Sequence, residues 1–143
     1  MFFSYNKTIN FSPKLKFLMK NLINIAIVEK NVFYRESLRT ILSQIPDFRI
    51  ISDTESYSDL MKISLAAKVD LVLLDEELTD SKCIQEIKNY FAKLNDVKIL
   101  ALSDHNNECF QKEIIQNGVD DIIQKHFSKK KIEEKIRSLI TTK

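Results

Sequence analysis

The stretch from Val69 to Glu77 constrains the fold most, because its apolar residues give way abruptly to acids. Its sequence is VDLVLLDEE, with Asp75 at the junction. A short apolar run that does not alternate with polar residues is typical of a strand covered on both faces, as in a parallel sheet. Asp75 is therefore predicted at the carboxyl end of a central strand, at the edge where open α/β sheets bind ligands.

Four further apolar runs alternate with segments of helical periodicity, which gives the pattern (βα)5. The predicted strands cover residues 23–28, 48–51, 69–75, 97–102 and 122–123. This alternation predicts an α/β fold with a parallel sheet, right-handed crossovers and helices on both faces. Five units are too few for an eight-stranded barrel, so we expect a flavodoxin-like three-layer sandwich with strand order 2-1-3-4-5.

The helices are predicted from their caps and apolar stripes. Ser58 is expected to cap the second helix and Ser128 the last one. Gly118, the only glycine, follows the fourth helix, where a left-handed residue is needed. The apolar stripes comprise Leu60, Ile63 and Ala67 in the second helix, Phe110, Ile114 and Ile115 in the fourth, and Ile132, Ile136, Leu139 and Ile140 in the last.

Length and composition predict one domain. The chain has 143 residues, of which 44% are hydrophobic and 29% charged. Residues 1–18 are expected to form a poorly structured extension before a domain at 19–143. Because residues 1–22 carry lysines and no acid, the remainder is mildly acidic, which argues against direct binding of nucleic acid. No run is long enough to span a membrane, and Cys83 and Cys109 fit reduced core or boundary thiols of a cytoplasmic protein.

Five polar side chains follow the ends of the predicted strands. They are Glu29 and Lys30 after the first strand, Asp75 after the third, Ser103 after the fourth and Lys125 after the fifth. Parallel strands bring their carboxyl ends to one edge, so these residues are expected to meet. A carboxylate beside a hydroxyl and an ammonium is suited to accept a phosphoryl group as a nucleophile.

Several segments resemble response-regulator receiver domains. IAIVEKNVFYRESLRTIL is similar to the opening of such domains, VDLVLLDEELTDSKCIQEIKNY to the phosphoacceptor strand and the next helix, and ILALSDH and NGVDDIIQKHF to the last two strands. The resemblance covers about residues 22–140. It implies that Asp75 is the phosphoacceptor, Ser103 the switch hydroxyl, Lys125 the lysine that contacts the phosphoryl group and Glu29 the first metal-site acid.

The chain departs from the family pattern at several positions. Lys30 replaces the second metal-site acid, and an ammonium offers a metal no ligand. Asp104 stands where a small residue is usual, so it could crowd or repel a phosphoryl dianion. Further replacements are Thr79 and His126 for prolines, Cys83 for a glycine and Ile122 for the aromatic residue that reports the switch. His105 and His126 have no partner at ligand spacing, so both are expected at the surface.

Two hypotheses for this pocket follow. In the favoured one, Lys30 and Asp75 form an ion pair that replaces the metal, and the domain works without phosphorylation. In the other, Glu29, Asp75 and the main-chain carbonyl of Glu77 hold Mg²⁺ weakly, and phosphorylation survives at reduced efficiency.

The resemblance implies a signalling module, not an enzyme. Its expected partners are a histidine kinase or other phosphodonor, a downstream protein bound through the fourth helix, fifth strand and fifth helix, and a second copy of the chain. A flavin- or nucleotide-binding enzyme is the alternative of another class, but residues 29–33 lack the glycines of a phosphate-binding loop. The FYRESL segment is similar to receivers joined to a helix-turn-helix output, so the amino-terminal part of a DNA-binding regulator is a further alternative.

Overall fold

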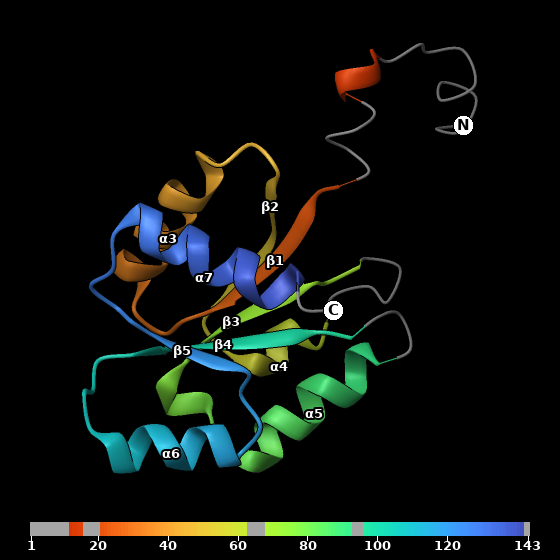
Figure 1. The fold of residues 1–143 in the computed structure, drawn as a ribbon. Coiled ribbons are helices and arrows are strands. Elements are labelled where there is room, and N and C mark those ends of the chain that lie inside the picture. Colours follow the sequence, from red (N-terminus) through yellow and green to blue (C-terminus); the bar gives the residue numbers. More distant parts are fainter. Residues whose placement is uncertain (1–11, 16–20, 63–67, 93–95, 142–143) are drawn as a thin grey trace.

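A five-stranded parallel sheet lies between two layers of helices in the computed structural model, which describes residues 12–15, 21–62, 68–92 and 96–141 (Figure 1). The strand order is β2-β1-β3-β4-β5, so the predicted order 2-1-3-4-5 is confirmed. The strands are β1 (Ile23–Val28), β2 (Phe48–Thr54), β3 (Leu71–Asp75), β4 (Lys98–Ser103) and β5 (Asp121–Gln124).

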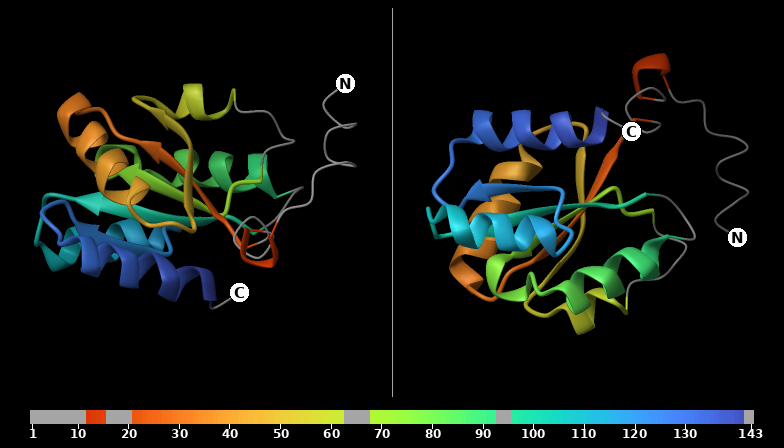
Figure 2. Two further views of the ribbon diagram at one scale, coloured as in Figure 1. Left: turned by 90° about the horizontal axis from the view of Figure 1, so that it is seen from above. Right: turned by 60° about the horizontal axis from the view of Figure 1, so that its bottom comes forward.

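The helices divide between the two faces of the sheet (Figure 2). They are α3 (Val32–Ser43), α4 (Tyr57–Leu60), α5 (Ser81–Phe91), α6 (Glu108–Gln116) and α7 (Lys129–Thr141), with a 3-10 turn, η1 (Glu76–Leu78), after β3. Leu71 and Leu73 pack in the core beneath α3 and α7, whereas Val72 and Leu74 pack in the core beneath α4, α5 and α6. Both faces of β3 are therefore covered, as its unalternated apolar sequence predicted.

Short polar side chains begin the helices. Asn31, Asp80 and Asn107 each accept a backbone N–H from the first turn of the helix that follows, and Ser128 does the same for α7. These caps satisfy donors that have no partner within the helix. The strand-to-helix connections that these residues form contain no glycine, since Gly118, the only one in the sequence, lies between α6 and β5.

Several local predictions differ from the structure: strand bounds shift by one to three residues, and Cys109 is exposed, not a core or boundary thiol. Ser56, not Ser58, caps α4, because Ser56 is extended and its hydroxyl accepts from Asp59 N. Strand β2 runs to Thr54, three residues beyond the predicted end. Ile115 is 45% exposed, since Ile114 beside it takes the position that faces the core.

Some predictions fall on residues that the structure does not describe. Ile63 and Ala67 lie outside the described residues, as does the predicted extension at 1–18 apart from 12–15. In α7, Ile132 and Ile136 are buried as predicted, and Leu139 and Ile140 are partly buried against the same core. No helix within the described ranges is long and apolar enough to cross a bilayer.

Gly118 provides a test of the helix-to-strand connection after α6. It has a φ of +116°, and an added Cβ would lie 3.0 Å from Ile84 Cγ2. Gly118→Ala should therefore lower the free energy of unfolding by about 1–3 kcal/mol, measured by urea denaturation. Gln116→Ala, an exposed position in the last turn of the same helix, should change it by less than about 0.5 kcal/mol. Equal effects of the two substitutions would contradict this account.

Candidate functional site

A cavity of about 300 Å³ opens at the carboxyl edge of the sheet. Its lining comes from the segments after β1, β3, β4 and β5: Glu29, Lys30, Asn31, Asp75, Glu76, Glu77, Asp104 and Lys125. Four of the five strand-end residues singled out in the sequence line this cavity. Parallel pairing brings them together, because β1, β3, β4 and β5 are neighbours that all end at this edge.

Asp75 ends β3 and is only 3% exposed. Its Oδ1 accepts a hydrogen bond from Glu77 N at 3.2 Å and lies 3.5 Å from Lys125 Nζ. Its Oδ2 accepts a long hydrogen bond, 3.5 Å, from the backbone N of Lys30. The carboxylate is thus fixed by two loops and one ammonium while it lines the cavity.

Lys125 supplies the ammonium that contacts the buried carboxylates of the cavity. Its Nζ lies 2.8 Å from Glu29 Oε1, 3.5 Å from Asp75 Oδ1 and 3.9 Å from Asp104 Oδ2. Burial alone would lower the pKa of Lys125, but the two buried carboxylates outweigh it and raise that pKa. Tyr34 fixes the segment, because its hydroxyl donates to Lys125 O at 2.8 Å.

Glu29 follows β1 and is 1% exposed. Burial raises the pKa of its carboxyl group, and the contact with Lys125 only partly offsets this effect. Oε2 accepts from Asn31 N at 2.9 Å. Oε1 lies 2.8 Å from Lys125 Nζ, a charge-assisted contact. A carboxylate oxygen has more than one lone pair, so Oε1 can take a further cationic partner beside Lys125.

The predicted ion pair between Lys30 and Asp75 is wrong. The Lys30 ammonium lies 3.1 Å from Glu77 Oε2, and its side chain is 56% exposed. Only the backbone N of Lys30 reaches Asp75. The buried position beside Asp75 is taken by Lys125, so the Lys30 side chain extends toward solvent.

Ser103 is at the expected strand end, but its hydroxyl is directed at another acid. Ser103 Oγ donates to Glu76 Oε2 at 2.7 Å, and both side chains are buried. The other Glu76 oxygen, Oε1, lies 2.8 Å from His105 Nδ1. Within the part of the chain that is described, Ser103 does not line the cavity. Asp75, Lys125 and Glu29 therefore form one cluster, and Ser103, Glu76 and His105 form a second cluster beside it.

Glu76 and His105 were not predicted as site residues. His105 was expected at the surface or its boundary, and it is exposed; the sequence did not indicate that it binds Glu76 and packs on Phe110, with the ring centres 5.2 Å apart. The sequence does contain a signal for Glu76, because two acids directly follow Asp75. Which of the two turns inward is decided by η1, which buries Glu76 and leaves Glu77 in solvent.

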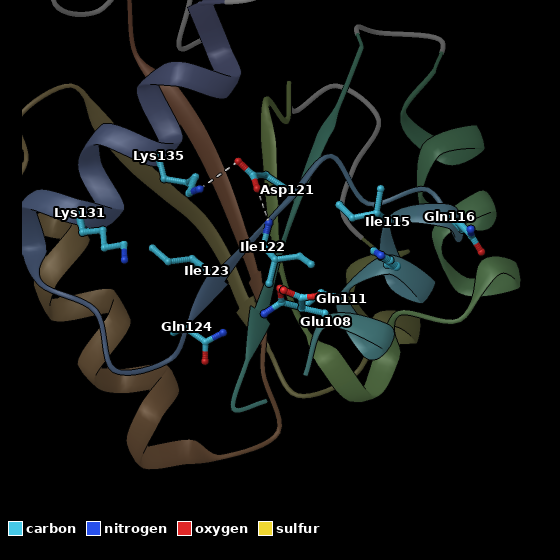
Figure 3. A pocket seen from close by; sticks show the side chains of 11 residues that line it. Glu108, Gln111, Ile115, Gln116, Asp121, Ile122, Ile123, Gln124, Lys131 and Lys135 are labelled. Carbon is cyan, nitrogen blue, oxygen red and sulfur yellow. Dashed lines mark hydrogen bonds and ion pairs between the residues drawn. The ribbon is translucent and has the colours of Figure 1, made fainter. Parts of the chain in front are cut away.

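A second cavity, of about 570 Å³, lies between α6 and α7 over β5 (Figure 3). Ile115, Ile122 and Ile123 give it apolar lining, and Lys131 and Lys135 approach it from α7. Lys135 is paired with Asp121 at 3.2 Å. We call this cavity the β5 groove.

The first cavity combines a fixed carboxylate with an ammonium and a second buried carboxylate. This arrangement can present an oxygen nucleophile to an electrophile whose negative charge Lys125 would stabilise. Within the described residues, no group of three or more acid, histidine or cysteine side chains is arranged to hold a metal ion. A metal ion in this cavity would have to be held by the carboxylates of Glu29 and Asp75 together with main-chain oxygen.

A family model described as "Response regulator receiver domain" matches residues 25–137. Among curated proteins, the chain is 24% identical over 106 residues to the transcriptional regulatory protein DegU of Brevibacillus brevis, covering 74% of this chain and 45% of DegU. It is 24% identical over 118 residues to the response regulator UvrY of Escherichia coli O157:H7, covering 82% of this chain and 54% of UvrY. The chain thus spans about half the length of these relatives.

Solved structures share the fold. The non-phosphorylated receiver domain of the stress response regulator RcsB from Escherichia coli has a TM-score of 0.73 at 18% identity, covering 86% of this chain and 96% of that one. A DNA-binding response regulator of the LuxR family from Staphylococcus aureus has a TM-score of 0.67 at 21% identity, covering 82% of this chain and 98% of that one.

Proposed function

Because the chain belongs to the response regulator receiver domain family, we propose that Asp75 accepts a phosphoryl group from a histidine kinase or a small acyl phosphate. The observation that carries the proposal is the placement of Asp75 Oδ1 3.5 Å from Lys125 Nζ in a solvent-open cavity. One Asp75 oxygen attacks the phosphorus, and the bond to the donor breaks with its electron pair passing to the leaving group. The products are an acyl phosphate on Asp75 and the dephosphorylated donor.

Lys125 stabilises charge on the transferred group. Its ammonium already faces Asp75 and Glu29, so a phosphoryl oxygen can replace part of the contact with Glu29. Asp104 opposes this effect, since its carboxylate lines the same cavity. We expect phosphorylation to be slower than in a receiver with a small residue at this position.

Receiver domains generally bind Mg²⁺, and this chain retains part of such a site. Glu29, Asp75 and the main-chain carbonyl of Glu77 would hold the ion, because carboxylate and carbonyl oxygens are the ligands that Mg²⁺ prefers. When bound, Mg²⁺ neutralises charge on the phosphoryl oxygens. Lys30 contributes no ligand, so the affinity is expected to be weak.

The output is proposed to be a protein contact on the face formed by α6, β5 and α7. The β5 groove supports this proposal, because it presents Ile115 and Ile122 to solvent between charged side chains (Figure 3). A downstream protein and a second copy of this chain are both candidate partners.

A second candidate function is the receiver part of a DNA-binding regulator. The names of relatives favour it, since DegU is a transcriptional regulatory protein and the Staphylococcus aureus protein is a DNA-binding response regulator. The DNA downstream of the codon for Lys143 discriminates the two candidates. A continuing frame that encodes a helix-turn-helix supports the second, and a stop codon there contradicts it.

Phosphorylation of Asp75 is tested by intact-mass measurement. After incubation with acetyl phosphate and Mg²⁺, the protein should gain one phosphoryl group, and Asp75→Asn should abolish the gain because an amide is not a nucleophile. Asp96→Asn is the matched control, since Asp96 is exposed and lies before β4, away from the cavity. It should be phosphorylated like the wild type. An unmodified wild-type mass would favour an interaction module that works without phosphorylation.

The weak metal site is tested by adding the missing acid. Lys30→Asp should increase Mg²⁺ affinity by about tenfold or more, because it supplies a carboxylate and removes a positive charge from the cavity. Isothermal titration calorimetry measures the change. Lys62→Asp, which makes the same charge change at an exposed residue outside the cavity, should leave the affinity within about twofold. Equal Mg²⁺ affinities for Lys30→Asp and wild type would contradict the assignment of Lys30 to this position.

A further inference from the structure

The hydroxyl of Ser103 is already engaged. Ser103 Oγ lies 2.7 Å from Glu76 Oε2 and 3.1 Å from His105 O, and it accepts from His105 N at 3.0 Å. A serine has one hydroxyl proton to donate. While that proton is directed at Glu76, it cannot be donated to a group carried by Asp75.

Glu76 is bonded through both of its carboxylate oxygens. Its side chain is 8% exposed, Oε2 lies 2.7 Å from Ser103 Oγ, and Oε1 lies 2.8 Å from His105 Nδ1. Thr79 also fixes the turn, because its hydroxyl donates to Glu76 O at 2.6 Å. A charge-assisted hydrogen bond within such a fixed frame is stronger than one between neutral groups.

This cluster also reaches the β5 groove. The carbonyl of His105 accepts from Gln124 Nε2 at 2.9 Å and from Gln111 Nε2 at 3.5 Å. Both glutamines line the groove, and Phe110 of α6 packs on the His105 ring. A continuous set of contacts therefore runs from the residue next to Asp75 to the α6–β5–α7 face, where Ile122 provides no aromatic side chain.

We propose that Glu76 is a positioning residue that retains the Ser103 hydroxyl away from Asp75. The inference rests on the proposed function, since it concerns what phosphorylation of Asp75 must displace. Transfer puts a dianionic group on Asp75, and Ser103 must leave Glu76 before its hydroxyl can donate to that group. Departure of Ser103 also removes two hydrogen bonds of the His105 backbone, whose carbonyl is bonded to Gln111 and Gln124 in the wall of the β5 groove.

The direct test measures phosphorylation rate with acetyl phosphate and Mg²⁺ by intact mass. Glu76→Leu removes the acceptor for Ser103 and should raise the rate by about fivefold, the effect of one net hydrogen bond. Glu76→Gln, which keeps the shape and a weaker acceptor, should give a smaller increase and remains available if Glu76→Leu does not fold. Glu113→Gln makes the same chemical change at an exposed residue of α6 and should have no effect.

A double-mutant cycle separates positioning from a merely structural role. In a Ser103→Ala background, Glu76→Gln and Glu76→Leu should no longer raise the rate, because no hydroxyl remains to be released. Amide hydrogen exchange gives a readout without phosphorylation: His105 N–H should exchange faster in Glu76→Leu than in wild type, since its acceptor Ser103 Oγ is no longer fixed.

The outcomes distinguish this inference from the proposed function. A phosphorylated wild type with unchanged rates in the Glu76 variants overturns the inference alone. An unmodified wild type with phosphorylated Glu76 variants supports the inference and shows that Glu76 blocks the site. A rate increase that persists without the Ser103 hydroxyl overturns the inference. Absence of phosphorylation in wild type and Glu76 variants overturns both.

Discussion

The interaction on which the site depends is the contact of one ammonium with two buried carboxylates. Asp75 and Glu29 are almost completely buried at the ends of neighbouring strands, where isolated charges would be costly. Lys125 compensates both, and its backbone is fixed by Tyr34 and by a hydrogen bond to Ser103 O at 2.9 Å. The strand ends fix the positions of the Glu29 and Asp75 carboxylates, and the Lys125 ammonium offsets the cost of burying their negative charges.

The second cluster connects the pocket to the β5 groove through hydrogen bonds. Glu76 directly follows Asp75, and its carboxylate binds both the Ser103 hydroxyl at the end of β4 and His105 in the following loop. That histidine is bonded through its carbonyl to a glutamine of the β5 groove. The route uses hydrogen bonds of polar side chains and of the His105 main chain.

Much of this arrangement could be predicted from the sequence, because it follows from periodicity. Unalternated apolar runs predicted five parallel strands, and the strand ends predicted that Glu29, Asp75 and Lys125 would meet. The partners of individual side chains could not be predicted in this way. Lys30 and Lys125 both follow strands that end near Asp75. The sequence does not indicate that the Lys125 side chain is the buried one and that Lys30 extends to Glu77. Likewise, the inward turn of Glu76 depends on η1, a three-residue turn without a periodic signature.

The most direct test of the central claim is the pKa of Glu29, measured by carbon-13 NMR of its carboxyl group. Burial and the nearby Asp75 carboxylate predict a Glu29 pKa above the usual range in the wild type, and a still higher pKa in Lys125→Met, where the compensating charge is removed. Glu76 is an internal control, because its hydrogen bonds should hold its pKa below the usual range in both proteins. A Glu29 pKa in the usual range, or one that does not change in Lys125→Met, would contradict the account.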